Sequence, residues 1–208
     1  MAAHGDLVQS AWSNRDIAAR IYVQQAIIDK PVPLIDAGEY SLPSLLMKVA
    51  VETGVPIGLE LAGDEPGKPA SYRGNQASVS LSRVLDEIIK SPYAWKENGG
   101  VINVFPKEEP TEVFHTEIAS FEARDALPIE MLQSLLKEPV IAGYLSQRRI
   151  TAATWVTGSV PVNRSSISIQ NLSFRAALNK IVLVAGRPGW TAFYQTQHGR
   201  QYLWFQLW

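Results

Sequence analysis

Few side chains in this 208-residue chain stand at a spacing that supports metal binding. The three histidines, His4, His115 and His198, are far apart, and no two of them have the spacing of paired metal ligands. On a strand, His115 and Glu117 would share a face, so this pair could bind a metal together with ligands from elsewhere. A surface pair without a metal is the plainer interpretation, and a solvated turn residue is the plain expectation for His198. We therefore expect no metal site.

Motifs for nucleophilic and cofactor chemistry are also missing from the sequence. The absence of cysteine excludes disulfides, thiolate catalysis and zinc sites built on sulfur. No Gly-x-Ser-x-Gly elbow is present, and the glycines form neither a phosphate-binding loop nor a dinucleotide fingerprint. The adjacent carboxylates Asp64-Glu65 and Glu108-Glu109 fall in expected loops, where they lack the defined separation across a cleft that glycosidases need. We expect a protein that is not an enzyme and binds no cofactor, with a hydrolase as the weaker alternative.

Charge and hydropathy narrow the range of partners. The 19 basic and 20 acidic residues leave a net charge of -1, which gives no field to attract nucleic acid or an anionic membrane. A hydrophobic fraction of 46% is typical of a globular protein. The longest aliphatic run, at 181–185, is too short to span a bilayer. We expect no nucleic-acid partner, no transmembrane segment and no export signal within the sequence.

Large aromatic residues are concentrated near the end of the chain, where the pattern predicts a β-hairpin around a turn at 197–200. Successive side chains of a strand point to opposite faces, so aromatic residues two positions apart lie on the same face of the hairpin. Only one face can pack against helices, and exposing the other would leave an apolar patch that monomers seldom show. The candidate interaction surface consists of Trp190, Tyr194, Tyr202, Trp204 and Trp208.

Three interpretations of these aromatic residues are open. The first half of the chain, the segment 140–158 or the N-terminal segment covers them, in which case they are core. Alternatively, a protein partner or a second copy of the chain docks on them, since tryptophan and tyrosine dominate binding hot spots. In the third interpretation, a glycan or peptide lies across the rings.

One amphipathic helix pattern occurs twice in the sequence. The first copy begins at Val79-Ser80-Leu81 and the second at Leu172-Ser173-Phe174. After each serine, apolar residues recur at relative positions 0, 3, 4, 7 and 8, which forms a single stripe on a helix. Each serine occupies the position where a side-chain oxygen caps the first turn. The repetition indicates two copies of one module.

The expected elements give an α+β fold of two tandem two-layer modules, each with two helices packed on a small mixed sheet. Each module has the order β-α-β-β-α-β-β. We place an N-terminal, mainly helical segment at 1–32, the first module at 33–106, a linker at 107–112 and the second module at 113–208. The linker is charged, contains a proline and has no apolar period. Residues 140–158 have no matching pattern in the first module.

Several local expectations follow from the same patterns. Residues 55–61 alternate apolar with other residues, which predicts a half-buried strand, and Pro56 places it near a sheet edge. Residues 113–123 are strand-like. A helix is expected to open at 125–128 and to stop at Pro139.

Two blocks of residues in the first module carry a resemblance to a known family. The first runs from Leu42 to Ile57 and contains Thr53-Gly54-Val55; the second runs from Val79 to Val104 and ends in Gly100-Val101-Ile102-Asn103-Val104. Residues 166–178 repeat part of this pattern in the second module. The chain thus resembles the short N-terminal domain of secretins and TonB-dependent transducers, the STN domain, in two tandem copies. It departs from that family at Lys90-Ser91-Pro92-Tyr93, where the family usually has a Gly-Thr-Gly-Leu-like turn.

The resemblance implies a periplasmic or exported bacterial protein that is not catalytic. Such a module passes signals or docks onto other proteins of the cell envelope, so the expected partner is an envelope protein or a second copy of the chain. A glycan- or peptide-binding protein that uses the C-terminal aromatic hairpin is the alternative.

Overall fold

The computed structural model describes residues 27–33, 35, 38–61, 70–72, 79–108, 112–156 and 163–208. Helices and strands are mixed along this chain, so the predicted α+β class is confirmed. Two expectations lie partly outside the described residues: most of the N-terminal segment 1–32 and the middle of the linker 107–112.

Residues 27–108, here called the first half, form two helices and seven strands among the described residues. These elements are β1 (Pro31–Val32), β2 (Gly38–Tyr40), α2 (Leu42–Thr53), β3 (Ile57–Leu61), β4 (Ala70–Tyr72), β5 (Val79–Ser80), α3 (Leu81–Ile88), β6 (Tyr93–Asn98) and β7 (Val101–Pro106).

Residues 112–208, the second half, begin with a short 3-10 helix and continue with helices and longer strands. They are η1 (Glu112–His115), β8 (Glu117–Ala126), α4 (Pro128–Leu135), α5 (Pro139–Gln147), β9 (Ile150–Val156), β10 (Ser165–Ser173), α6 (Phe174–Val184), β11 (Gly189–Gln197) and β12 (Arg200–Leu207).

The helix ends follow the local signals of the sequence. Ser41 and Ser173 each accept a hydrogen bond from the amide three residues ahead, at 3.3 Å, and so cap α2 and α6. Gly54 ends α2 in the left-handed conformation, with φ 63°. Ser80 occupies the same position before α3 but caps no amide, because its Oγ lies 3.1 Å from the Oγ of Ser82 instead.

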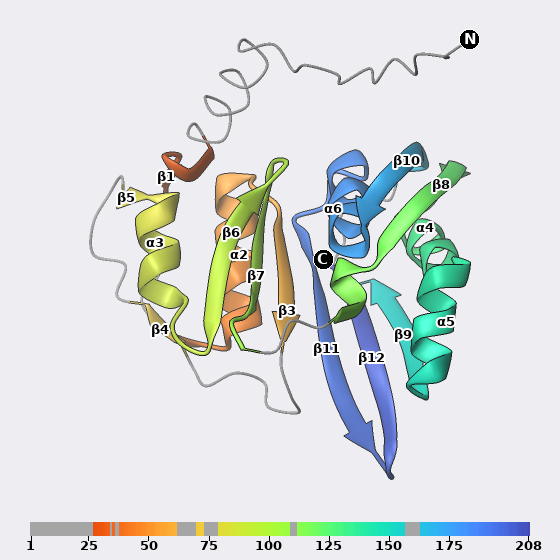
Figure 1. The fold of residues 1–208 in the computed structure, drawn as a ribbon. Coiled ribbons are helices and arrows are strands. Elements are labelled where there is room, and N and C mark those ends of the chain that lie inside the picture. Colours follow the sequence, from red (N-terminus) through yellow and green to blue (C-terminus); the bar gives the residue numbers. More distant parts are fainter. Residues whose placement is uncertain are drawn as a thin grey trace, which may run out of the picture.

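One six-stranded sheet runs through both halves, in the order β6-β7-β3-β11-β12-β9. β3 and β11 lie side by side at its centre and pair in parallel from Ile57–Gly189 to Leu61–Phe193 (Figure 1). The sequence predicts a separate small sheet for each half. Instead, three strands from each half join edge to edge, so the two halves share one sheet.

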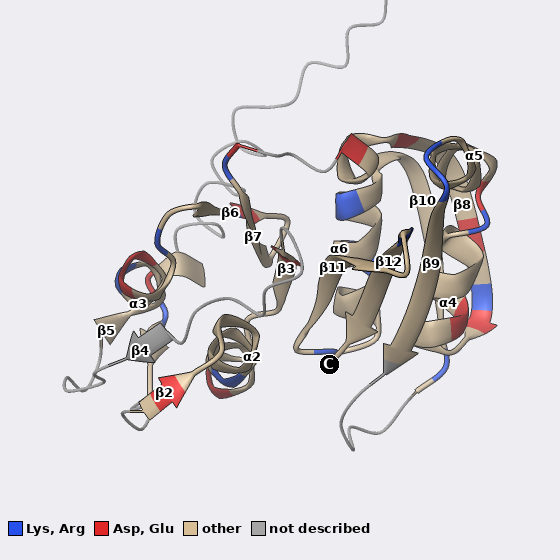
Figure 2. Ribbon diagram, turned by 90° about the horizontal axis from the view of Figure 1, so that it is seen from below, with Lys and Arg blue, Asp and Glu red and all other residues tan. Residues whose placement is uncertain are grey.

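The helices of the two halves cover opposite faces of this sheet. Ile57 and Leu59 of β3 belong to the hydrophobic core that contains α2 and α3. Gly58, between them, faces the indole of Trp190, which belongs to the core that contains α4 and α6. We call the two sides the α2 face and the α6 face. Charged residues of both signs are spread over both halves (Figure 2).

Strand β3 is buried along its whole length, from Ile57 to Leu61. The expectation of a half-buried strand near an edge is therefore wrong. Pro56 lies before the strand, where its missing N–H removes no ladder hydrogen bond, and its carbonyl accepts the amide of Ile102 at 3.0 Å. Both faces of β3 are covered because the strand lies at the junction of the two halves.

One prediction for the second half also needs correction. Val113 and Phe114 are buried in η1 and not in a strand, and β8 begins only at Glu117. The helix predicted to stop at Pro139 does end before it, at Leu135, and Pro139 then opens the separate helix α5, since a proline is tolerated in a first helical turn. The segment 140–158, which showed no counterpart in the first module, provides most of α5 and the edge strand β9.

Two-stranded antiparallel ladders lie outside the main sheet. β2 pairs with β4 and contacts of this ladder reach α2 and α3, while β8 pairs with β10 on the helices α4 and α6. β1 pairs with β5 at the start of the first half. In each half the helices are thus placed between a two-stranded ladder and the shared sheet.

Gly189→Ala is expected to destabilise the protein. A Cβ atom there would lie 2.0 Å from the carbonyl oxygen of Ile57 and 2.9 Å from the ring of Trp208, so β3 and β11 would have to separate. We expect a loss of about 1–3 kcal/mol in unfolding free energy, measured by urea denaturation. Gly143→Ala is the control: apart from its chain neighbours and the backbone of its own helix, no described atom lies within 4 Å of the added Cβ, and in α5 the substitution should raise the unfolding free energy by about 0.5–1 kcal/mol. A Gly189→Ala protein as stable as the wild type would contradict the close approach of the strands.

Candidate functional site

The structure separates the five aromatic residues predicted to form one interaction surface. Trp190 is 1% exposed in the second-half core, and its Nε1 donates to Oδ1 of Asn179 at 2.9 Å. Trp208 is 4% exposed and belongs to the first-half core, with its Nε1 donating to Oγ1 of Thr191 at 2.9 Å. Neither tryptophan lies on a surface, so their assignment to one is corrected.

The cross-strand register explains this separation. Alternation along β12 correctly places Tyr202 and Trp204 on one face, which is the α2 face. Trp190 and Tyr194 of β11 pair with Leu207 and Leu203, which face the other side and belong to the second-half core. Tyr194 is partly buried there, and this burial raises the pKa of its hydroxyl above the ordinary value.

Tyr202 and Trp204 join two further aromatic residues to form what we call the aromatic cluster: Trp155, Phe193, Tyr202 and Trp204. The ring centroid of Trp204 lies 5.3 Å from that of Trp155, 6.0 Å from that of Tyr202 and 6.4 Å from that of Phe193. All four side chains are partly exposed. Phe193 contacts the margin of the first-half core, whereas α4 and α6 pack on the other face of the sheet.

The indole of Trp204 contacts three aromatic rings, but its N–H group is unsatisfied. Its Nε1 is buried and has no hydrogen-bond partner among the described residues, which is costly for a donor in a folded protein. Buried indole N–H groups usually find an acceptor, as those of Trp190 and Trp208 do. Trp204 therefore lacks the indole hydrogen bond that Trp190 and Trp208 each make.

A partly buried ion pair links the two halves on the α6 face. Glu60 of β3, 1% exposed, accepts two hydrogen bonds from Arg175 of α6, from Nε and, at 3.0 Å, from Nη2. Burial raises the pKa of Glu60, and the hydrogen bond and charge of Arg175 oppose this rise. The guanidinium also lies over the ring of Phe105, 5.2 Å from its centroid.

Arg187, three residues after the end of α6, is a fully buried arginine. It is 1% exposed, and all three nitrogens of its guanidinium are buried without a hydrogen-bond partner among the described residues. Burial lowers the pKa of Arg187 below its ordinary value. Its neighbours in a shallow hollow between the ends of α2 and α6 include Val182 and Pro188. The described residues that line this hollow include no carboxylate to pair with Arg187, as Glu60 pairs with Arg175.

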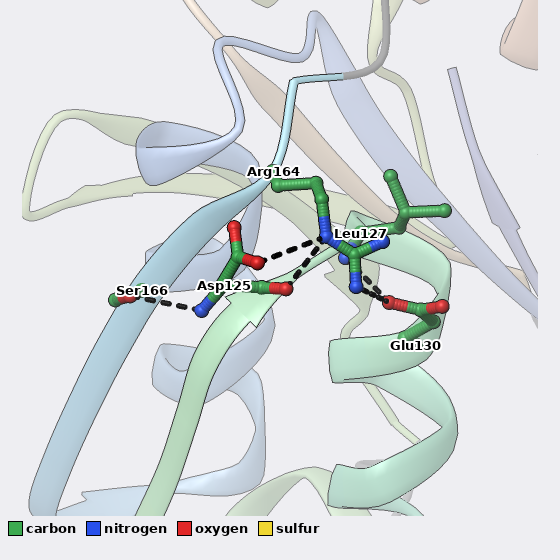
Figure 3. Close-up of polar contacts among 5 residues, drawn as sticks. All are labelled: Asp125, Leu127, Glu130, Arg164 and Ser166. Atoms are coloured by element: carbon green, nitrogen blue, oxygen red, sulfur yellow. Dashed lines mark hydrogen bonds and ion pairs between the residues drawn. The ribbon is translucent and has the colours of Figure 1, made fainter.

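A group of charged side chains at the β8–α4 turn has a structural role (Figure 3). Arg164 donates to the carbonyl oxygen of Asp125 at 2.7 Å and to Glu130 at 3.4 Å. Glu130 in turn accepts the amide of Leu127 at 2.8 Å, and the amide of Asp125 donates to Ser166 at 3.0 Å. These contacts cap α4 and fasten β8 to β10, which accounts for the charges without a catalytic role.

The two residues considered for metal binding, His115 and Glu117, lie on different elements, since His115 ends η1 and Glu117 begins β8. No group of three or more His, Cys, Asp or Glu side chains in the described part of the chain is placed to hold a metal ion. Nor does any helix among the described residues have the length and apolar character needed to cross a membrane.

Comparison with known protein families, with curated proteins and with solved structures finds no match for this chain. The resemblance to the STN domain therefore stays a prediction.

Arg187 and Arg175 lead to opposite expectations when each is replaced by methionine, which keeps most of the side-chain volume. Arg187→Met removes a buried charge that has no partner among the described residues and should raise the unfolding free energy by about 1–3 kcal/mol. Arg175→Met leaves Glu60 buried and unpaired and should lower it by about 3 kcal/mol. Urea denaturation of both variants measures the difference, and a loss of stability in Arg187→Met would show that its guanidinium has a stabilising partner.

Proposed function

We propose that the protein is a non-catalytic interaction protein, built from two copies of one α+β module, that docks a protein partner through the aromatic cluster. The observation that carries this proposal is the cluster itself: Trp155, Phe193, Tyr202 and Trp204 lie together, partly exposed, on the α2 face of the sheet. Large aromatic side chains in such a group are the usual anchors of protein interfaces.

The strand pairings support the duplication. In the first half β7 lies between β6, antiparallel to it, and β3, parallel to it. In the second half β12 lies between β11 and β9 with the same directions. The ladders β2–β4 and β8–β10 also correspond, and so do the pairs α2 with α4 and α3 with α6. On this assignment η1 and α5 are additions to the second copy.

The geometry of the rings favours a protein partner over a glycan. Sugar rings bind to aromatic platforms whose faces are free. Here Trp204 stacks on Phe193 and on Tyr202, with interplanar angles of 18° and 26°, and Trp155 meets it edge-on at 64°. Because the rings contact one another in this way, they offer edges and a contoured apolar surface, which suits the side chains of a protein.

The resemblance to the STN domain supports a location in the bacterial cell envelope, periplasmic or exported, and an envelope protein as the partner. A second copy of this chain is the other occupant that the aromatic cluster would accept. An envelope protein and a second copy of the chain would both contact the aromatic cluster on the α2 face.

Site-specific photo-crosslinking in cells that express the full protein tests the docking face. A photoreactive phenylalanine analogue replaces Tyr202, and in the control it replaces Val140, which is 45% exposed on α5. We expect one specific protein adduct from position 202 and none from position 140, because only the first lies in the aromatic cluster. Adducts of the same proteins from both positions, or none from 202, would contradict the proposal.

Trp204→Ser provides the matching loss-of-contact variant. It should abolish the adduct formed at position 202 while circular dichroism shows the fold retained, since Trp204 lies at the sheet surface. If the purified variant instead fails to fold, the cluster belongs to the core. Saturable quenching of wild-type tryptophan fluorescence by cell-wall fragments, absent in Trp204→Ser, would support the glycan alternative.

A further inference from the structure

A hollow of about 590 Å³ lies on the α6 face of the sheet, beside the contact between the halves. This volume falls within the range of about 300–1,000 Å³ that is typical of small-molecule sites. β6 and β7 form its floor, and η1 and the first turn of α6 form its wall. We call it the basic hollow, and the residues used in the argument are Lys96, Asn103, Phe105, Lys107, His115 and Arg175.

Cationic side chains reach the basic hollow from three places in the fold: Lys96 from β6, Lys107 from the end of β7 and Arg175 from α6. Arg175 is matched by Glu60, but the described residues provide no carboxylate partner for either lysine. Glu97 also lines the hollow and contributes a negative charge, although one of its oxygens accepts the amide of Gly100 at 2.7 Å. The three cations therefore exceed the carboxylates Glu60 and Glu97 by one positive charge, which an anion would neutralise.

The cation at the back of the hollow is held in place before any ligand binds. Arg175 is fixed by its two hydrogen bonds to Glu60 and by the rings of Phe105 and Phe114, whose centroids lie 5.2 and 5.9 Å from the guanidinium carbon. A side chain that is already ordered loses little conformational entropy on binding. Arg175 therefore forms an ordered part of the wall, next to the two exposed lysines.

A buried amide in the floor leaves an acceptor that a donor on the ligand, such as a hydroxyl beside its anionic group, would satisfy. Asn103 is 2% exposed, and its Nδ2 donates to the carbonyl oxygen of Val101 at 3.2 Å. Its Oδ1 is buried and accepts no hydrogen bond from the described residues, which is unfavourable. Nearby, burial and the charge of Arg175 lower the pKa of His115, which favours the neutral ring, and a neutral imidazole offers both a donor and an acceptor.

We propose that the basic hollow binds a small oxyanion, a compound whose carboxylate or phosphate group lies between Lys96 and Lys107 and whose remaining part contacts Phe105. The aromatic cluster lies on the opposite face of the sheet, so such a ligand leaves the docking face free. Binding in the basic hollow is therefore independent of protein docking, and a separate experiment tests it.

Titration of the ¹⁵N-labelled full chain tests this site, with inorganic phosphate in one series and succinate in the other. Ionic strength is held constant with sodium chloride, so that general screening does not change along the titration. We expect saturable shift changes at the amides of Lys96, Asn103, Lys107 and His115. The anion that binds more tightly tells whether the hollow prefers a phosphate or a carboxylate group.

Single substitutions test whether Lys96 and Lys107 bind the anion. Lys96→Ala and Lys107→Ala should each weaken the binding by about tenfold, the loss expected for one charge-assisted hydrogen bond. Lys137→Ala is the matched control, because Lys137 is equally exposed but lies after α4, outside the hollow. Shift changes that rise linearly with either anion, or equal weakening in all three variants, would overturn the proposal.

Discussion

The parallel pairing of β3 with β11 is the interaction on which the rest of the structure depends. Two glycines permit it: Gly58 leaves room for the indole of Trp190, and Gly189 lets the backbone of β3 approach closely. The pairing is reinforced on the α6 face by Glu60 and Arg175, which are 115 residues apart in sequence. On the α2 face, Trp208 packs in the core of the first half. Contacts on both sides of the sheet thus fasten the second half to the first.

Features encoded within short windows could be predicted from the sequence. The capped helices, the left-handed Gly54 and the two hairpins rest on signals that span fewer than a dozen residues. The parallel pairing of β3 with β11 could not be predicted. The two strands are separated by more than half of the chain, and no local pattern encodes such a contact. Pro56 shows how a local rule fails in this case: a proline excludes a central ladder position only when it lies within the strand.

The candidate site was partly predictable for the same reason. Alternation correctly put Tyr202 and Trp204 on one face, but it could not match the faces of two strands. The two-residue turn His198-Gly199 contains that information, because it pairs Gln197 with Arg200 and so sets Phe193 opposite Trp204. Trp155 had no such signal, since β9 joins β12 only through a parallel pairing. The basic hollow likewise gathers residues from four separate segments, which only the fold brings together.

The way in which the two halves join explains why both candidate surfaces exist. Each half provides three strands to the main sheet and helices that cover only one face of them. If the halves had stacked face to face, both uncovered faces would have been buried. Because they join edge to edge with their helices on opposite sides, each half leaves part of one face without a helix of its own. Helix α6 reaches only the margin of the first-half strands, where the basic hollow lies, and α2 reaches only the margin of the second-half strands, next to the aromatic cluster. A shared sheet of this kind unites the halves and, by the same geometry, keeps two chemically different surfaces open on its opposite sides.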